Sequence, residues 1–435
     1  MNSRISSAFF LVALLLVGAL GALYYVKAEW TPPTLSVTPE QSTASAKTVF
    51  TIQAVDEDSD LRSLLVVATQ GGNTVDIISK TLPEGTKELR EEFLLPKAAL
   101  KNGPLTLTVT VKDTSWHRLG RGNRAQIVRE LTIDSKSPMI SVLSGQHNVN
   151  HGGTGLIVYS TDEELAKSGV NMGEHFFPGY PYTPGKYLCF FAIPYNIDPK
   201  TVTPTLMATD LAGNEVTVGF SFRPLFKKFK QDSINISDSF LQSKMGQFTD
   251  LYPNVTQPSD LFLKVNSELR AKNVKFLLEL GKNTVPQKLW DGTFIRLPNS
   301  APMAGFADNR TYMYQGKPVD NQTHLGVDLA SLVASPVPAG NTGRVILAEF
   351  MGIYGNVVVI DHGFGVHSLY SHLSEIHVHT GDTVQREQII GKTGATGMAG
   401  GDHLHFGMLI SGLEVQPIEW WDAHWIKDNI TSKLE

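Results

Sequence analysis

An uncharged apolar run near the N-terminus, AFFLVALLLVGALGALYYV at residues 8–26, sets the first constraint on the fold. As a helix it would extend roughly 28 Å at about 1.5 Å per residue, close to the thickness of a bilayer's hydrocarbon core. Tyr24, Tyr25 and Trp30 lie where interfacial aromatic side chains gather. A cleaved signal peptide is the alternative, but its apolar region is usually shorter. We therefore expect residues 1–30 to form a transmembrane anchor.

Charge and cysteine content exclude several classes of function for the rest of the chain. Arg4 precedes the apolar run, and the positive-inside tendency then places the remaining residues outside the cytoplasm. A net charge of −5 gives no general attraction to polyanions, so nucleic acid is not an expected partner. Cys189 is the only cysteine, which excludes an intrachain disulfide and a thiolate metal cluster.

The segment after the apolar run reads as short, alternating strands. In LTLTVTVKD, Leu105 and Val109 share one face and Thr106 and Thr108 share the other, the pattern of a half-buried antiparallel strand. Runs of this kind separated by turn residues are typical of a β-sandwich. We expect an immunoglobulin-like sandwich over residues 31–135.

A second unit of the same kind is expected over residues 136–223. It closes with TPTLMATDLAGNEVTVGFSF, in which DLAGN supplies a turn between two strands, because Gly213 and Asn214 tolerate positive φ. The hairpin resembles the last one of many bacterial immunoglobulin-like domains. Both sandwiches are interpreted as spacers whose protein partners, if any, are unknown.

Residues 224–300 change in character and are expected to form a helical connector. Phe262, Val265 and Leu269 recur at helical spacing after a cap at Ser259 or Asp260. No catalytic set occurs in this stretch.

Histidines concentrate in the last third of the chain, where glycines separate short strands. In DHLHFGMLI, strand alternation places His403 and His405 on one face. HLGVDLA adds His324 and Asp328, and LYSHL adds His372, which is expected to share a strand face with Tyr370. Two imidazoles and one carboxylate form the three-ligand set of a catalytic zinc site that leaves a fourth position for water.

Together these stretches resemble the lysostaphin-like (LytM-type) zinc metalloendopeptidases, which cleave peptide bonds in peptidoglycan. The motifs occur in the family's order, and VHTGDTVQREQIIGKTGATG resembles the hairpin that precedes the family's final strand. The resemblance implies an antiparallel β metallopeptidase domain over residues 301–428. It also implies one Zn²⁺ per chain, with the ligands His324, Asp328 and His405, and the catalytic histidines His372 and His403. Which of these two histidines is the base is left open.

One position departs from the family pattern. The family often has Phe-Glu after the paired histidines, whereas here Phe406 is followed by Gly407. The missing glutamate is not a metal ligand in the family, so the departure concerns a contact around the site.

The sequence as a whole is mainly β in fold class and is interpreted as a single-pass protein of the cell inner membrane. Its catalytic domain would lie in the periplasm or cell envelope and hydrolyse peptide bonds in peptidoglycan stem peptides or cross-links. The alternative is a non-catalytic protein that binds the wall or activates a separate amidase. A further hypothesis is that residues 224–300 and the loop 307–323 cover the cleft and restrain activity.

Overall fold

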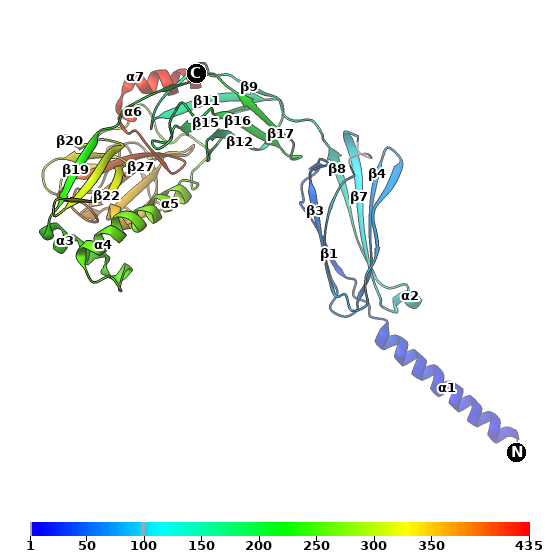
Figure 1. Cartoon of the computed structure of the whole chain (residues 1–435). Helices are drawn as coiled ribbons and strands as arrows, with labels where there is room; N and C mark the ends of the chain where they lie inside the picture. The colour runs from blue at the N-terminus through cyan, green and yellow to red at the C-terminus, as the bar shows by residue number, and fades with distance from the viewer. Residues whose placement is uncertain (1, 97–100) are drawn as a thin grey trace. The chain divides into compact units, whose positions relative to one another are not determined.

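The computed structural model describes residues 2–96 and 101–435 and is mainly β, with an N-terminal apolar helix and several sheets (Figure 1). This confirms the expected fold class. The chain divides into two compact units, Met1–Pro138 with Thr209–Glu215, and Met139–Ala208 with Val216–Glu435. The finer domain boundaries expected from the sequence remain a prediction.

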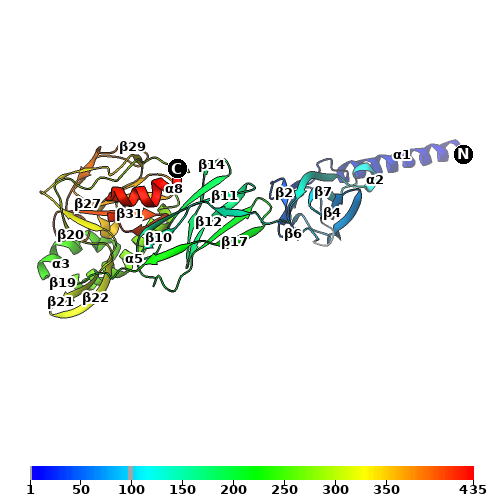
Figure 2. The ribbon, with the colours of Figure 1, turned by 90° about the horizontal axis from the view of Figure 1, so that it is seen from above.

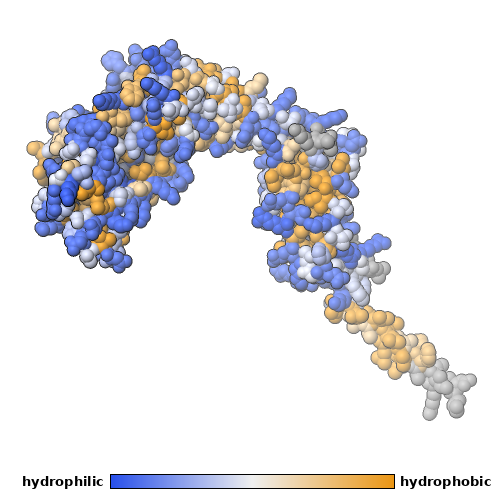
Figure 3. Space-filling model, viewed as in Figure 1, coloured by the Kyte–Doolittle hydropathy of each residue, from blue (hydrophilic) through white to orange (hydrophobic). Residues whose placement is uncertain are grey.

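The first unit begins with α1 (Asn2–Lys27), whose residues Phe9–Lys27 are long and apolar enough to cross a membrane, with a mean hydropathy of 2.4. Figure 3 shows the apolar surface along this helix. A signal sequence would have the same length and composition. The helix is therefore compatible with either an anchor or a signal.

Two β-sheets follow α1 in the first unit, and their strands pair antiparallel except for β2, which is parallel to β8. One sheet has the order β1 (Thr34–Thr38), β3 (Val49–Val55), β6 (Glu88–Leu94). The other has the order β2 (Thr43–Ala44), β8 (Arg124–Ile133), β7 (Gly103–Asp113), β4 (Leu61–Gln70), β5 (Asn73–Thr81), and a short helix, α2 (His117–Gly120), precedes β8. Phe50 and Ile52 from β3 share a core with Leu105 and Val109 from β7, as the alternation of β7 predicts.

Two four-stranded sheets follow along the chain and, apart from residues Thr209–Glu215, belong to the second unit. Their orders are β14 (Tyr180–Thr183), β15 (Lys186–Ala192), β11 (Thr154–Thr161), β9 (Ile140–Val142), and β13 (His175–Pro178), β12 (Leu165–Met172), β16 (Thr205–Asp210), β17 (Glu215–Gly219). The expected DLAGN turn does join β16 to β17. A parallel pair, β10 (His147–Asn150) and β18 (Phe222–Leu225), lies beside them.

An antiparallel sheet forms the centre of the C-terminal part. Its order is β20 (Ala301–Ala304), β23 (Val327–Ala330), β31 (Leu404–Ile410), β27 (Val366–Leu373), β26 (Asn356–Asp361), β25 (Gly343–Phe350), β29 (Thr383–Val384), with β32 (Leu413–Val415) also paired to β31. A small sheet, β24 (Pro336–Pro338), β30 (Ile389–Lys392) and β28 (Glu375–Ile376), lies next to it, and η4 (Gly352–Tyr354) joins β25 to β26. Short helical turns end the chain: α6 (Ile418–Trp421), α7 (Ala423–Ile426), η5 (Lys427–Thr431) and α8 (Ser432–Leu434).

The stretch expected to be a helical connector is only partly helical. β19 (Gln231–Ile236) pairs in parallel with β21 (Asp308–Tyr314), which pairs with β22 (Lys317–His324), as Figure 2 shows. The helical part comprises α3 (Asp238–Lys244), η2 (Met245–Leu251), α4 (Pro258–Lys264), η3 (Val265–Leu269) and α5 (Arg270–Leu280). The helix starts at Pro258 and not after a Ser259 or Asp260 cap, because proline's fixed φ suits the first helical position.

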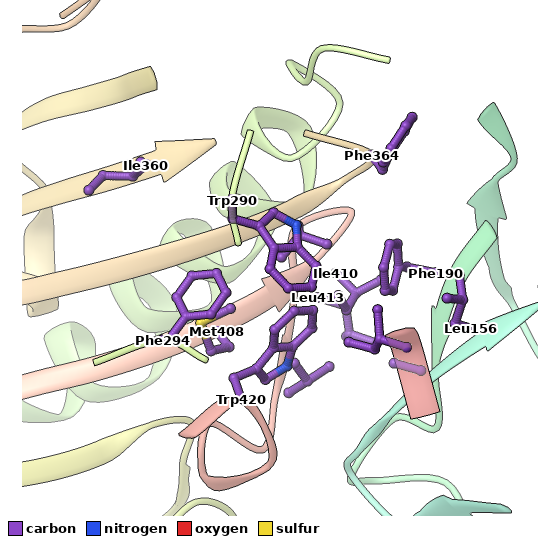
Figure 4. Close-up of a cluster of buried hydrophobic side chains, with 14 of the residues drawn as sticks. Leu156, Phe190, Trp290, Phe294, Ile360, Phe364, Met408, Ile410, Leu413 and Trp420 are labelled. Carbon is purple, nitrogen blue, oxygen red and sulfur yellow. The ribbon is translucent and has the colours of Figure 1, made fainter. Parts of the chain in front are cut away.

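Residues 281–300 have no regular structure but are anchored by aromatic packing (Figure 4). The Trp290 and Phe294 rings lie 5.6 and 5.4 Å from that of Trp420 on α6, and Phe190 of β15 lies 6.1 Å from Trp420. These side chains belong to one core with the buried face of the central sheet. The stretch 224–300 is thus built into the C-terminal fold.

Candidate metal centre

Three side chains from neighbouring strands converge on one point. His324 ends β22, Asp328 lies on β23, and His405 lies on β31, where it is the register partner of Asp328 and so shares its face. His324 Nε2 lies 2.9 Å from Asp328 Oδ1 and 2.9 Å from His405 Nδ1, and His405 Nδ1 lies 3.0 Å from Asp328 Oδ1. All three side chains are largely buried.

The chemistry of these three atoms fits a metal ion. His324 Nδ1 donates to the carbonyl of Gly305 at 2.8 Å, so Nε2 carries a lone pair that faces the other two ligand atoms. A tetrahedral zinc ion with bonds of about 2.0–2.1 Å needs ligand atoms roughly 3.3 Å apart, close to the observed separations. Two imidazole nitrogens and one carboxylate oxygen are also the donor types that zinc prefers.

Gly326 makes this approach possible. A Cβ at this position would lie only 2.4 Å from His405 Nε2. Gly326 has no positive φ, so its role here is to leave room for the imidazole.

Arg310, on β21, fixes the second oxygen of the candidate ligand Asp328. Its Nη2 donates to Oδ2 at 3.0 Å, and both side chains are mostly buried. Oδ1 is left facing the two histidines. Burial opposes the charge of Asp328, but His324, His403 and His405 together hold the pKa of this carboxyl well below its usual range.

His372 and His403 complete the group of five residues selected from the sequence. His372 Nδ1 donates to the carbonyl of Thr396 at 2.9 Å, and His403 Nδ1 donates to that of Gly401 at 2.9 Å. Their Nε2 atoms are therefore the ones available for proton transfer. The two rings lie 4.9 Å apart, and the His372 ring lies 5.7 Å from that of His405.

His372 reaches the centre by an irregularity that was not predicted. The expectation that it shares a strand face with Tyr370 is wrong: the Tyr370 hydroxyl accepts from the backbone N–H of Gly340 in the opposite core. The pairing of β27 with β26 contains a bulge, and His372 has a φ of +65°. This left-handed residue turns the imidazole towards the ligands.

A cavity of about 690 Å³ opens beside the five residues. His324, Asp328, His372 and His405 contribute to its wall. The rest of the lining comes from β19 and α3, the end of η4 and the loop before β31; it includes Ile236, Ser237, Phe240, Lys244, Tyr354 and Met398. The candidate ligands therefore face a cavity and not a closed core.

The structure also shows where residues 307–323 and His367 lie. The stretch 307–323 is not a loop but mostly the hairpin of β21 and β22. Tyr312 lines the cavity, whereas the Tyr314 hydroxyl donates to Asp238. His367 is buried, with Nε2 3.4 Å from Asp361 Oδ1.

The residues that sequence reasoning missed come from outside the motifs. Arg310 and Lys244 lie before the first motif, and no spacing signal joined them to it. Tyr354 also lines the cavity, and its hydroxyl donates to the buried Glu414 at 2.7 Å. Burial raises the pKa of Glu414 to about 7.

Comparison with known proteins supports this reading of the C-terminal region. Residues 322–417 match Peptidase family M23. DD-carboxypeptidase/endopeptidase Mpg of Neisseria meningitidis serogroup B is 39% identical over 95 residues, and Peptidoglycan DD-endopeptidase ShyA of Vibrio cholerae serotype O1 is 38% identical over 96 residues. Each alignment covers 22% of this chain and 22% of the relative, so the likeness spans about a fifth of the relatives' length.

One solved structure is also similar to part of this chain. The catalytic domain of lysostaphin from Staphylococcus simulans is 27% identical, with a TM-score of 0.26, over 29% of this chain and 96% of that domain. The five candidate residues all lie between 322 and 417. The chain carries, at its C-terminal end, a domain of Peptidase family M23.

Proposed function

We propose that this protein is a zinc-dependent endopeptidase that hydrolyses peptide bonds in peptidoglycan stem peptides or cross-links. The observation that carries the proposal is the convergence of His324, Asp328 and His405, with two more histidines beside them, on one cavity. The names of the relatives Mpg and ShyA support the choice of substrate.

The proposed ligands are His324 Nε2, Asp328 Oδ1 and His405 Nδ1. A zinc ion bound there supplies Lewis-acid activation of water and of the scissile carbonyl. His372 and His403 are the proposed catalytic residues. Their Nε2 atoms can accept a proton from the attacking water and, once protonated, donate to the developing oxyanion or to the leaving amine.

Two neighbours are proposed to position the ligands. The Gly305 carbonyl fixes the His324 tautomer, and Arg310 occupies Asp328 Oδ2, so that the carboxylate presents Oδ1 alone. Asp328 is thus a monodentate ligand in this proposal, which leaves a coordination position free for substrate or water.

The proposed location follows from α1. As an uncleaved anchor, this helix would make the protein a single-pass protein of the cell inner membrane, with its catalytic domain in the periplasm or cell envelope. The proposed partners are the membrane and peptidoglycan.

The test is mass analysis of muropeptides released from defined peptidoglycan by the zinc-loaded, detergent-solubilised full chain. We expect products of peptide-bond cleavage, and none from His405→Ala. Binding of peptidoglycan without product, under conditions in which the protein retains one zinc per chain, would favour the non-catalytic alternative.

A further inference from the structure

The cavity beside the metal centre has a charge opposite to that of the chain. The protein carries a net charge of −5, yet the cavity wall contains Lys244, Arg270 and Arg310 and only one carboxylate, the proposed ligand Asp328. A cavity lined by one sign of charge attracts a ligand of the other sign. This balance points to an acidic substrate.

Two of the three cations already have partners in the protein. Arg310 donates to Asp328 Oδ2, and Arg270 donates to the side-chain and backbone oxygens of Asn266. Lys244 differs from both, because the one hydrogen bond of its ammonium group within the described part of the chain is to the carbonyl of Ala395 at 2.6 Å. Among the described residues, no carboxylate lies within ion-pair distance of its Nζ.

Lys244 is also partly shielded from water. It lies at the last turn of α3, and burial lowers its pKa from the usual value of lysine. An ammonium has three donors, so the bond to Ala395 leaves two available. A partly desolvated cation with free donors is well suited to form a charge-assisted hydrogen bond with a ligand carboxylate.

We propose that Lys244 is a specificity-determining residue that recognises a free carboxylate of the peptide substrate. This inference rests on the proposed function and deepens it, because it selects acidic peptides over otherwise identical amidated ones. Lys244 lies on α3, outside the M23 match at 322–417. The preference for a free carboxylate would therefore come from α3 and not from the family motifs.

Gln247 provides a matched control for the structural role of Lys244. Its Oε1 accepts from the backbone N–H of Gly397 at 3.0 Å, so it ties the same helical segment to the same loop without any charge. Loss of Gln247 should therefore loosen the cavity wall but should not discriminate between charged and neutral substrates.

The experiment uses a synthetic cross-linked stem-peptide dimer in two forms, one with its side carboxylates free and one with them amidated. Both are assayed with the zinc-loaded full chain. For Lys244→Met we expect KM for the free-acid dimer to rise roughly ten-fold with kcat little changed, and KM for the amidated dimer to stay within about two-fold. Lys244→Arg should retain most of the preference, and Gln247→Met should affect both dimers equally.

An equal loss on both dimers with Lys244→Met would overturn the inference and leave only the structural contact with Ala395. If the wild-type protein cleaves neither dimer, the proposed function fails. The two dimers are then compared by calorimetric binding to the same proteins. Equal dissociation constants for both dimers with the wild type would overturn the role of Lys244 independently.

Discussion

The central sheet and the segment made of β19, α3, β21 and β22 (the preceding segment) contribute to the candidate site in different ways. The sheet supplies Asp328 and His405 from paired strands, where register alone places them on one face. The preceding segment supplies Arg310 and Lys244, which reach the site or its cavity from β21 and α3. We infer that the sheet supplies two of the three proposed metal ligands, while the preceding segment supplies the third, His324 at the end of β22, orients Asp328 and shapes the cavity wall.

The largest effect is expected from a change on the sheet. His405→Ala removes one of three proposed ligands, and two ligands seldom retain a catalytic metal, so bound zinc and hydrolysis should both disappear. Metal content by mass spectrometry and muropeptide release are the measurements. Zinc content equal to that of the wild type would contradict the assignment of His405 as a ligand.

A second sheet residue should separate metal binding from turnover. His372→Ala leaves all three proposed ligands in place, so zinc content should stay near one per chain while kcat falls by about 10²–10⁴-fold, the usual contribution of a general acid or base. Full activity of the variant would remove His372 from the mechanism.

A change in the preceding segment should lower zinc affinity less than the loss of a ligand does. Arg310→Met frees Asp328 Oδ2 and should weaken zinc binding by about 10–100-fold, as loss of a contact to a ligand typically does. Chelator competition measures the affinity, and Arg344→Met, an exposed arginine on β25, is the control. Identical affinities for the two variants would mean that the segment does not orient the ligand.

The smallest effect concerns the stability of the fold in acid. It tests a buried histidine beside the central sheet that lies outside the candidate site. His362 follows β26 and is fully buried; Nδ1 donates to the carbonyl of Thr342, and Nε2 accepts from the Ser368 hydroxyl. Burial lowers its pKa from 6.5 to about 3. A group with a lowered folded-state pKa stabilises the fold above its unfolded pKa, and that stability is lost as the pH falls through the folded value.

The free energy of unfolding should therefore decline below about pH 6.5 and towards pH 3, by at most about 1.4 kcal/mol per pH unit from this residue. Urea unfolding at a series of pH values gives the slope. His362→Gln should flatten it; the same slope in both proteins would assign acid sensitivity to other groups.

Much of the sheet could be predicted from strand alternation and glycine position. The alternation in β7 predicted its buried face, and DHLHFGMLI predicted the shared face of His403 and His405, which both lie beside Asp328, because side chains in a strand repeat every two residues. The position of His372 could not be predicted in this way. Its bulge reverses the alternation, and a single sequence does not mark where a strand adds a residue.

The contribution of the preceding segment was beyond sequence reasoning for a different reason. Arg310 and Lys244 carry no motif, and only the tertiary packing of β21 and α3 brings them to the cavity. The sequence reading of 224–300 as a connector missed β19 because only two apolar residues, Ile234 and Ile236, alternate in it, too short a pattern to distinguish a strand from a loop.

The pairing of β19 with β21 limits how far the protein can be shortened from its N-terminal side. A protein begun at residue 301 would retain β21 and β22 but leave the β21 edge without its parallel neighbour, and it would uncover apolar side chains such as Ile353 and Leu409 that pack in one core with Phe248 and Leu277. Unpaired edges and bare apolar faces promote aggregation. A fragment that keeps this core and this strand pairing intact must therefore reach back at least to Gln231, well before the residues 322–417 that match the family.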